Sequence, residues 1–411
     1  MNCGLLGRHL THSYSPQIHS HLGSYGYDLF QVEPEDLEGF FQRRVFDGIN
    51  ITIPYKKAAI SYCDELSPQA QTLGAVNTIV KTKDGRLIGH NTDFFGFYSL
   101  LRKSALSVSG KKVLVLGSGG AAVTVWAVLR QENAKAVIVS RSGENNYQNL
   151  YLHTDASVIV NATPVGMYPN NGVTPIDLSL FPKLEGVLDL IYNPARTKLL
   201  LDAENRGIVA ENGLWMLVAQ AKESAEWFTG TKIPDIKIEE IYKSLQKQME
   251  NIILIGMPGC GKSTVGNLLA EKTGRKFVDA DTAITEKAGI SIPEIFANSG
   301  EAVFREIETT VLAEICKGSG LVIATGGGCV TRSENYPLLH QNGRIIWIKR
   351  DISSLPTDGR PLSQSNDLSQ MYQKRAPLYA NFADITAIND ESVEETANRI
   401  LGGLRNENPC N

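Results

Sequence analysis

The residues best suited to chemistry begin at Gly256, where the sequence reads GMPGCGKST. Gly256, followed after four residues by Gly261, Lys262 and Ser263, matches a phosphate-binding pattern that comes directly after an apolar run. In such a loop the backbone N–H groups surround phosphate oxygens, the lysine reaches the outer phosphates and the hydroxyl can ligate Mg²⁺. The pattern predicts a nucleotide-binding loop whose contacts come from Gly259, Cys260, Gly261, Lys262, Ser263 and Thr264.

Two carboxylates follow this loop in the stretch FVDAD. Asp279 and Asp281 stand two positions apart at the end of a predicted strand, so both are expected to face the loop. One could hold the metal together with Ser263, and the other could serve a substrate hydroxyl. Residue type and spacing leave open which of the two carboxylates takes which role.

Arg305 and a glycine turn add to the same half of the chain. Arg305 lies in GEAVFREIE, a predicted helix, where an ion pair with Glu301 or Glu308 explains it equally well from spacing alone. Three glycines in TGGG end a predicted strand and permit a ligand to approach the backbone closely. The segment 353–367, rich in Pro, Gly and Ser, carries Arg360 and is long enough to form a lid.

The first half carries a different set of polar residues. Lys56 follows a predicted strand and turn in GINITIPYKK, and Asp93 lies in the polar loop GHNTD. A lysine and an aspartate make a candidate acid and base pair for proton transfer to a carbonyl oxygen during hydride delivery. Ser13 and Ser15 share one face if their segment is extended, and their two hydroxyls could grip a polyol.

A glycine fingerprint of another kind stands in KKVLVLGSGGAAV. Gly117, Gly119 and Gly120 lie between a predicted strand and an apolar helix, with Ala122 in place of a third glycine, which predicts a dinucleotide-binding turn. Arg141 ends the next predicted strand, where an NAD site usually presents a carboxylate to the ribose. A cation there favours the 2′-phosphate of NADP.

The elements that must hold these residues follow from the periodicity. Short apolar runs alternate with helical stretches, which predicts an α/β fold with parallel strands buried on both faces. The chain of 411 residues suits about two or three domains. The runs predicted to be strands are 111–117, 156–162, 186–192, 251–256, 321–326 and 344–349.

A polar helical stretch, 237–251, is expected to run into the junction between the halves near Met249. We expect a substrate-binding domain at 1–105 to which residues 211–248 return, a Rossmann-like cofactor domain at 106–210, and a nucleotide-binding domain at 249–411. Only 20 residues lead from Arg141 to Asn161, so the cofactor domain is expected to lack about one βα unit.

Composition excludes several classes of protein. With 40 basic and 44 acidic side chains the net charge is −4, which does not favour nucleic acid as a partner. No apolar run approaches the roughly 18 to 20 residues of a membrane span, and the first residues lack the order of an export signal. Six scattered cysteines without a CxxC pair are typical of reduced thiols. We expect a cytoplasmic protein with small-molecule substrates, and its oligomeric state stays open.

The motifs from about residue 250 to the end together resemble those of the shikimate kinases: the phosphate-binding loop, FVDAD, GEAVFREIE, the GGG turn, RPL at 360–362 and RAPLY at 375–379. This resemblance implies ATP, Mg²⁺ and shikimate as ligands. It implies that Asp281, Arg305, Gly327 and Arg375 hold shikimate, with the two arginines on its carboxylate. With Asp281 on the substrate, Asp279 is assigned to the metal together with Ser263. Arg360 would move from the lid onto the transferring phosphoryl group.

Residues 4–247 resemble the shikimate dehydrogenases, through SxSP, NxTxPxK, GAVNT, NTD, GxGGAA, NATPxGM at 161–167 and NGLxMLxxQ at 212–220. The resemblance implies that Lys56 is the catalytic acid and base with Asp93 beside it. The substrate residues it implies are Ser13, Ser15, Thr52, Asn77, Asn91, Asp93 and Gln220, with Tyr192 nearby. The NADP(H) residues it implies are Gly117, Ser118, Gly119, Gly120, Ala121, Arg141 and Gly213.

Together the two resemblances predict a fusion that reduces 3-dehydroshikimate to shikimate with NADPH and phosphorylates shikimate with ATP. The usual Asn-Arg-Thr of the family is Ser-Arg-Ser at 140–142, so the choice between NADP and NAD stays open. Two alternatives also stay open. The first half could oxidise quinate with NAD, or one half could be a ligand sensor without turnover.

Overall fold

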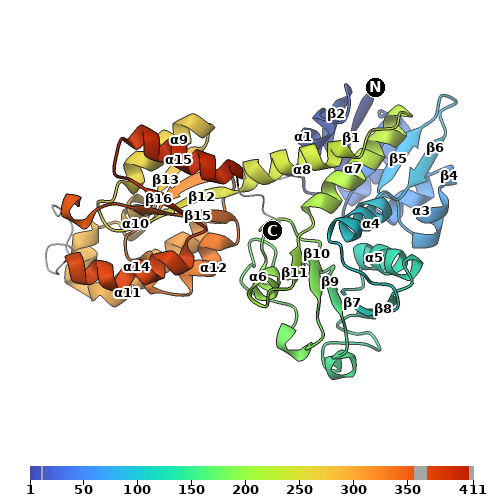
Figure 1. Ribbon diagram of the computed structural model, residues 1–411. Helices are drawn as coiled ribbons and strands as arrows, with labels where there is room; N and C mark the ends of the chain where they lie inside the picture. Colours follow the sequence, from blue (N-terminus) through green and yellow to red (C-terminus); the bar gives the residue numbers. More distant parts are fainter. Residues whose placement is uncertain (11–12, 356–367, 407–411) are drawn as a thin grey trace. The chain divides into compact units, whose positions relative to one another are not determined.

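The computed structural model describes residues 1–10, 13–355 and 368–406, and these divide into two compact units (Figure 1). The first unit comprises Met1–Tyr192 and Thr197–Leu245, and the second comprises Asn193–Arg196 and Gln246–Asn411. Among the described residues no helix is long and apolar enough to cross a membrane. The cysteines in this part of the chain, Cys3, Cys63, Cys260, Cys316 and Cys329, are free thiols.

The first sheet of the first unit has six strands in the order β2-β1-β3-β5-β6-β4. Its strands are β1 Asn2–Gly7, β2 Gly26–Gln31, β3 Gly48–Ile51, β4 Glu65–Leu66, β5 Thr78–Lys81 and β6 Leu87–His90. β1 runs parallel to β2 and β3, whereas β5 is antiparallel to β3 and β6. Its helices are α1 Ser15–Ser20, α2 Leu37–Arg43 and α3 Pro68–Leu73, with 3₁₀ turns at Pro34–Asp36 and Ala58–Tyr62. The functional side chains of this sheet follow strand ends, where the chain leaves the buried core.

The second sheet has five strands in the order β11-β10-β9-β7-β8, and neighbouring strands pair in parallel. Its strands are β7 Lys112–Leu116, β8 Lys135–Val139, β9 Val158–Asn161, β10 Gly186–Asp189 and β11 Val209–Glu211. Its helices are α5 Gly120–Gln131 and α6 Lys198–Asn205, with a 3₁₀ turn at Leu178–Leu180. Between β8 and β9 the structure has a 3₁₀ turn, Leu150–His153, where a doubly wound fold usually has a helix.

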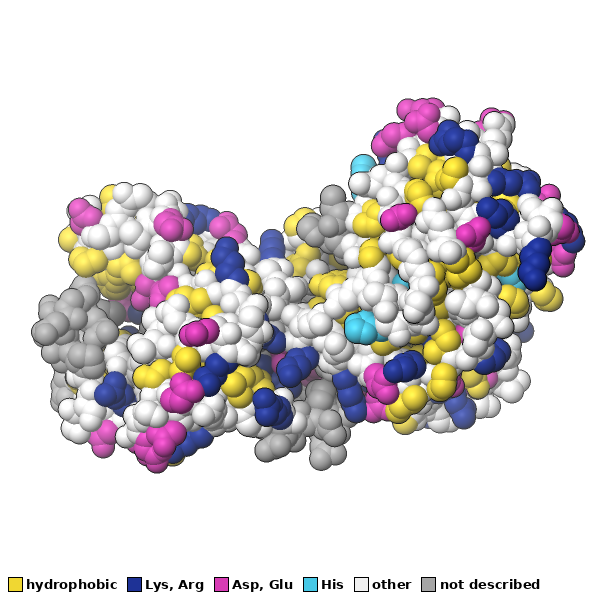
Figure 2. Space-filling model, turned by 90° about the horizontal axis from the view of Figure 1, so that it is seen from above, with side chains coloured by type: hydrophobic (Ala, Val, Ile, Leu, Met, Phe, Trp, Pro, Cys, Tyr) yellow, Lys and Arg dark blue, Asp and Glu magenta, His cyan; other side chains and the backbone are white. Residues whose placement is uncertain are grey.

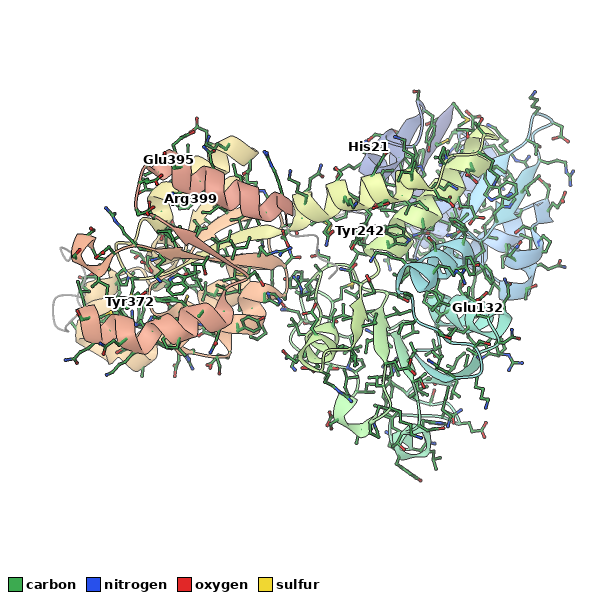
Figure 3. The ribbon with its side chains drawn as sticks, viewed as in Figure 1. His21, Glu132, Tyr242, Tyr372, Glu395 and Arg399 are labelled. Carbon is green, nitrogen blue, oxygen red and sulfur yellow. The ribbon has the colours of Figure 1, made fainter. Side chains whose placement is uncertain are left out.

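Two further helices of the first unit lie side by side, α4 Asp93–Lys103 and α7 Leu214–Thr229 (Figure 1). α4 carries the chain from the first sheet to the second, and α7 carries it back. α8, Ile236–Met249, follows, and Figure 3 labels its Tyr242. The ring centroid of Tyr242 lies 5.3 Å from that of Trp215 on α7. The packing of α4 against α7 therefore connects the two sheets of the first unit.

The second unit is built on a parallel sheet of five strands in the order β13-β14-β12-β15-β16. Its strands are β12 Asn251–Ile255, β13 Lys276–Asp279, β14 Leu321–Ala324, β15 Gly343–Lys349 and β16 Ile385–Ile388. Its helices are α9 Lys262–Thr273, α10 Ala280–Ala288, α11 Ile292–Ile315, α12 Asn335–His340, α14 Leu368–Phe382 and α15 Val393–Asn406, with 3₁₀ turns at Cys329–Thr331 and Ile352–Ser354. Figure 1 shows α9 and α15 on one face of this sheet and α11, α12 and α14 on the other.

The predicted α/β fold is confirmed, because each of the six apolar runs contains a strand of a parallel ladder. β9, β10 and β12 are buried along their whole length, as strands covered on both faces must be.

On the face that Figure 2 shows, basic and acidic side chains lie interspersed.

Candidate active sites

An ion pair between Lys56 and Asp93 forms the centre of the first site. Lys56 lies in the turn after β3, and its Nζ donates a hydrogen bond to Asp93 Oδ2 over 2.6 Å. Asp93 was expected in a loop, but it is the first residue of α4, where the helix N-terminus favours an ionised carboxylate. The side chains of Lys56 and Asp93 are 27% and 7% exposed. The ammonium is therefore held by a buried anion and still reaches the surface, as a proton donor to a ligand must.

The amide of Asn77 connects this pair to α7. Asn77 Nδ2 donates to Gln220 Oε1 and to Thr92 Oγ1, each over 3.1 Å, and the backbone N–H of Thr92 donates to Asn77 Oδ1 over 2.7 Å. Thr92 directly precedes Asp93, so the same network orients the start of α4. The structure thus brings together Lys56, Asp93, Asn77 and Gln220. Thr92 was not among the predicted site residues, although it stands inside the NTD motif.

Tyr14, which stands between Ser13 and Ser15, contacts Tyr192. The rings of Tyr14 and Tyr192 pack edge to face with centroids 6.2 Å apart. The premise of an extended segment is wrong, because Ser15 is the first residue of α1 and its N–H donates to Ser13 Oγ over 3.2 Å. Burial, with a smaller effect of Tyr14, raises the pKa of Tyr192. Its phenol therefore keeps its proton and can donate a hydrogen bond.

Thr52 and Asn91 occupy the ends of neighbouring elements. Thr52 is half-buried directly after β3. Asn91 is buried directly after β6, and its Nδ2 donates to the carbonyl oxygen of Ala75 over 3.0 Å. Asn91 also lines a second cavity, which none of the other predicted site residues lines. Its role toward substrate therefore stays a prediction.

The predicted dinucleotide turn leads from β7 into α5. Gly117 has a φ of +112°, a conformation that favours glycine. β-Carbons at Gly119 and Gly120 would meet no atom within 4 Å, so open space lies above the start of α5. Ser118 is exposed and Ala121 is half-buried at the same place. The backbone N–H groups at this helix start are suited to a pyrophosphate.

Gly213 and Arg141 were both predicted to line the cofactor site. A β-carbon at Gly213 would lie 2.1 Å from the carbonyl oxygen of Leu190, so glycine is required there by the contact of α7 with the end of β10. The sequence had indicated only a ligand contact. Arg141 is exposed just after β8, and among the described residues it forms no hydrogen bond or ion pair. Its guanidinium is available to an anionic ligand.

The second unit contains a cavity of about 470 Å³ at the carboxyl ends of its strands. Ligands of open parallel sheets bind at this edge. Of the predicted residues, the cavity is lined by Gly259, Gly261, Lys262, Ser263, Thr264, Asp279, Asp281, Arg305, Gly327 and Arg375. Cys260 is buried, and its carbonyl oxygen accepts a hydrogen bond from Asn389 Nδ2. Arg360 and the rest of the predicted lid lie outside the described residues.

The phosphate-binding loop has the expected backbone. Gly256, Gly259 and Gly261 have φ values of +143°, +81° and +102°. Lys262 Nζ donates to the carbonyl oxygens of Gly256 and Met257, each over 3.0 Å. Its ammonium therefore lies over the loop that would surround a phosphate.

Ser263 and Asp279 lie together, as the metal prediction requires. Ser263 Oγ donates to Asp279 Oδ2 over 2.6 Å. A hydroxyl and a carboxylate oxygen beside a phosphate cradle are ligands that suit Mg²⁺. These two residues therefore fit the metal.

Asp279 and Asp281 share the cavity for a reason other than the one predicted. β13 ends at Asp279 and α10 begins at Ala280, so Asp281 lies in the first helical turn and strand alternation does not apply. Asp279 is the N-cap, and its Oδ1 accepts the N–H of Asp281 over 3.0 Å. The helix start, with its favourable dipole, turns both carboxylates toward the loop.

Arg305 forms the ion pairs expected of its helix and also lines the cavity. Its Nη1 donates to Glu308 Oε2 over 2.7 Å, and its Nη2 donates to Glu301 Oε1 over 3.1 Å. Burial raises the pKa of Glu308, and the neighbouring Arg305 opposes this effect. Burial alone would lower the pKa of Arg305, but Glu308 and Glu301 together raise it. The guanidinium is thus a fixed cation in the wall.

Arg375 on α14 supplies a second cation. It is buried, and its Nη1 donates to the carbonyl oxygen of Gly327 over 3.0 Å. A third arginine, Arg350, was not among the predicted site residues. It directly follows β15, lines the cavity, and among the described residues forms no hydrogen bond or ion pair. Its place at the end of a strand predicted to be buried was the signal that could have indicated it.

Family models match two parts of the chain. Residues 5–79 match a model described as the shikimate dehydrogenase substrate binding domain. Residues 258–405 match a model described as shikimate kinase.

Relatives cover the first part. A shikimate dehydrogenase (NADP(+)) from Clostridium perfringens is 33% identical over 270 residues, 59% of this chain and 97% of the relative. A chorismate mutase/shikimate 5-dehydrogenase fusion protein from Clostridium acetobutylicum has 37% identity and a TM-score of 0.56, over 59% of this chain and 96% of that one. A shikimate 5-dehydrogenase from Thermus thermophilus, in complex with NADP(H) and shikimate, has 31% identity and a TM-score of 0.55. The match covers 59% of this chain and 99% of that one.

Proposed function

The chain belongs to the shikimate dehydrogenase family and carries a shikimate kinase domain behind it, and we propose that it reduces 3-dehydroshikimate to shikimate and then phosphorylates shikimate. The proposal depends above all on one observation in each unit. In the first unit Lys56 is held on Asp93 over 2.6 Å. In the second unit one cavity joins the phosphate-binding loop to Asp281, Arg305 and Arg375.

In the first site the chain must bind a keto acid and protonate its oxygen. When bound, NADPH supplies a hydride to the carbonyl carbon. Lys56 donates a proton to the oxygen that becomes the hydroxyl, and Asp93, which accepts a hydrogen bond from Lys56 Nζ, orients the ammonium. Asn77 and Gln220, already tied to each other, present amide groups to the hydroxyls and carboxylate of the substrate. Ser13 and Ser15, at the start of α1, and Tyr192, in the segment after β10, would close the site.

NADP is the cofactor that we propose for this site. The name of the Clostridium perfringens relative and the ligands of the Thermus thermophilus structure support it. Gly119 and Gly120 leave space for the pyrophosphate at the start of α5, and the exposed guanidinium of Arg141 suits the 2′-phosphate. NAD as cofactor and quinate as substrate are the alternative that the assay below tests.

In the second site Asp281 accepts the proton of the attacking hydroxyl, and Lys262 stabilises the charge on the transferring phosphoryl group. Arg305 and Arg375 hold the carboxylate of shikimate, since buried guanidinium groups bind carboxylates in fixed geometry. Ser263 and Asp279 would hold Mg²⁺, which neutralises phosphate charge when bound. We propose domains at 1–105 with 211–248, at 106–210 and at 249–411, supported by the three separate sheets.

The test supplies the purified chain with 3-dehydroshikimate, NADPH, ATP and Mg²⁺. We expect loss of NADPH absorbance and formation of shikimate 3-phosphate, detected by mass spectrometry. Lys56→Ala should stop NADPH oxidation and spare the phosphorylation of added shikimate, whereas Lys262→Ala should do the reverse. Each half is thus the folding control for the other. Unchanged turnover in both variants would contradict the assignments, and faster turnover with NAD and quinate would favour the alternative.

A further inference from the structure

Three buried hydroxyl groups from three elements of the first unit meet in one cluster. They belong to Thr78 at the start of β5, Thr92 directly before α4 and Ser224 on α7, and each of these residues is 0% exposed. Ser224 Oγ lies 2.8 Å from Thr78 Oγ1 and 3.0 Å from Thr92 Oγ1, and the two threonine oxygens lie 3.3 Å apart. None of the three was among the predicted site residues. We refer to these three side chains as the hydroxyl cluster.

One side of the cluster fixes the amide of Asn77. Thr78 Oγ1 donates to Asn77 Oδ1 over 3.2 Å, and the backbone N–H of Thr92 donates to the same oxygen over 2.7 Å. A rotation of the amide by half a turn would place Nδ2 against that backbone N–H, donor against donor. Oδ1 therefore stays toward Thr92, and Nδ2 is turned to Gln220 Oε1, to which it donates over 3.1 Å.

The other side of the cluster is held by Asn50 on β3. Its Nδ2 donates to Ser224 Oγ over 2.8 Å and to Thr78 Oγ1 over 3.0 Å. Its Oδ1 accepts the phenol of Tyr27 over 2.8 Å. Burial above all raises the pKa of Tyr27, so the phenol keeps its proton and stays a donor. The orientation of the Asn50 amide is thereby fixed as well.

The directions of these hydrogen bonds connect the cluster to two proposed substrate residues. Because Asn50 donates to both Thr78 and Ser224, each of the two hydroxyls can give its own proton to another acceptor. Thr78 donates to Asn77 Oδ1, and Ser224 donates to the carbonyl oxygen of Gln220 over 3.0 Å. The cluster thus holds both amide residues that we propose for the substrate.

The chemistry of the cluster indicates a role in orientation. Apolar side chains could fill this space without loss of hydration, whereas buried hydroxyls must be hydrogen-bonded. A network in which every member is satisfied fixes one arrangement of its groups. The groups fixed here are Asn77, Gln220 and the first turn of α4, which carries Asp93.

We propose that Thr78 and Ser224 are positioning residues for the reduction of the keto acid, and that they act through Asn77 and Gln220. With Oε1 held by Asn77, Gln220 offers its Nε2 to an oxygen of the substrate. Loss of a cluster hydroxyl lets the two amides rotate, and a substrate oxygen then meets an acceptor in place of a donor. The inference rests on the proposed dehydrogenase function.

Two substitutions at Thr78 separate the hydroxyl from the packing. Thr78→Val keeps the shape and the β-branch but removes the hydroxyl, whereas Thr78→Ser keeps the hydroxyl and leaves a small cavity. Initial rates of NADPH oxidation by the full chain, at varied 3-dehydroshikimate and NADPH, give the kinetic constants for both. We expect Thr78→Val to lower kcat/KM for 3-dehydroshikimate by about tenfold, the effect of one hydrogen bond. Thr78→Ser should stay near wild type, and the KM for NADPH should not change in either variant, because the glycine turn after β7 is not touched.

Ser224→Ala tests the same cluster from α7, and Ser104→Ala is its matched control. Ser104 is also buried, and its Oγ donates to the carbonyl oxygen of Leu101 over 2.8 Å. Each change therefore removes one buried serine hydroxyl that is bonded to a nearby carbonyl oxygen. We expect Ser224→Ala to lower kcat/KM for 3-dehydroshikimate by about tenfold and Ser104→Ala to leave it near wild type.

Thermal unfolding and the phosphorylation of added shikimate report whether each variant is intact. A purely structural role predicts that kcat/KM follows the thermal stability of the variants, and this result would overturn the inference. Equal kcat/KM in Thr78→Val and Thr78→Ser, or in Ser224→Ala and Ser104→Ala, would also overturn it and leave the proposed function standing. If Thr78→Val does not fold, the serine pair decides. A wild-type chain that does not oxidise NADPH with 3-dehydroshikimate would refute the proposed function and the inference with it.

Discussion

The position of Arg305 can be tested through a glycine that it contacts. A β-carbon at Gly328 would lie 2.0 Å from Nη2, 2.3 Å from Cζ and 2.5 Å from Nη1 of Arg305. Gly328 has a φ of −107°, so alanine is compatible with its backbone. Gly328→Ala therefore acts by displacing the guanidinium. Since non-bonded atoms need about 3.5 Å, the group must move by more than about 1 Å.

The expected effect is on shikimate binding by the kinase. Glu308 and Glu301 hold the guanidinium in place, so the displaced group either loses these bonds or takes a wrong orientation. The loss of one charge-assisted hydrogen bond to the substrate carboxylate costs about 1.5–3 kcal/mol. This corresponds to a rise of about 10- to 150-fold in the KM for shikimate. The KM for ATP should change little, because the phosphate-binding loop is not touched.

Initial rates of ADP formation at varied shikimate and ATP measure both constants. Gly402→Ala is the matched control, since its β-carbon would meet no atom within 4 Å and alanine favours the helix α15. NADPH oxidation by the same samples shows whether the rest of the chain is intact. A KM for shikimate within twofold of wild type, in a folded Gly328→Ala variant, would refute the assignment of Arg305 to the carboxylate.

Three further predictions concern single side chains. Arg350→Gln should raise the KM for ATP by about tenfold in the kinase assay, since Arg350 lines the cavity of the phosphate-binding loop. Lys349→Gln, which changes the exposed neighbour, is the control and should leave this KM unchanged. Equal effects of the two changes would contradict the prediction. Arg141→Ser should lower the ratio of kcat/KM for NADPH to that for NADH by about tenfold or more, and an unchanged ratio would argue against a 2′-phosphate contact. Burial raises the pKa of Asp189 from 3.8 to about 6, so the folded state holds a proton that the unfolded state has lost. The stabilisation from this group is therefore complete below about pH 4 and lost as the pH rises through 6. The free energy of unfolding in urea, measured for wild type and for Asp189→Asn, should differ by an amount that declines over this pH range. A difference that does not change with pH would refute the prediction.

The phosphate-binding loop could be predicted because its residues are close in sequence. The loop from Gly256 to Ser263 combines a strand end, a glycine turn and a helix start, all of which are local properties of the chain. The parallel strands were equally accessible, since burial on both faces requires continuous apolar runs. Lys56 and Asp93 were paired by their chemistry and by a family resemblance, and their contact confirms only that they meet.

Other features depended on contacts across the fold. Asp281 was assigned to a strand, yet the capping carboxylate of Asp279 starts a helix one residue earlier, and propensity alone does not place that boundary. Whether Arg305 serves its own helix or the cavity was undecided at i,i+3 and i,i+4 spacing, and the structure shows both. Gly213 stays a predicted ligand contact, and the structure adds a second reason for glycine there, since the carbonyl oxygen of Leu190 leaves no room for a side chain.

The sequence by itself indicated the two chemistries. The glycine turns and the lysine of the phosphate-binding pattern are specified by residue type and short spacing. Lys56 and Asp93 were paired by residue type and by the family resemblance. Only the tertiary structure decided which distant groups meet. Arg350 lines one cavity with the phosphate-binding loop, Asn77 is hydrogen-bonded to Gln220, and His90 and Glu223 line another cavity. These meetings result from the packing of α4, α7 and the sheet ends. Such long-range contacts produce no pattern of fixed spacing in a single sequence, because they depend on the volume and burial of side chains rather than on their separation along the chain.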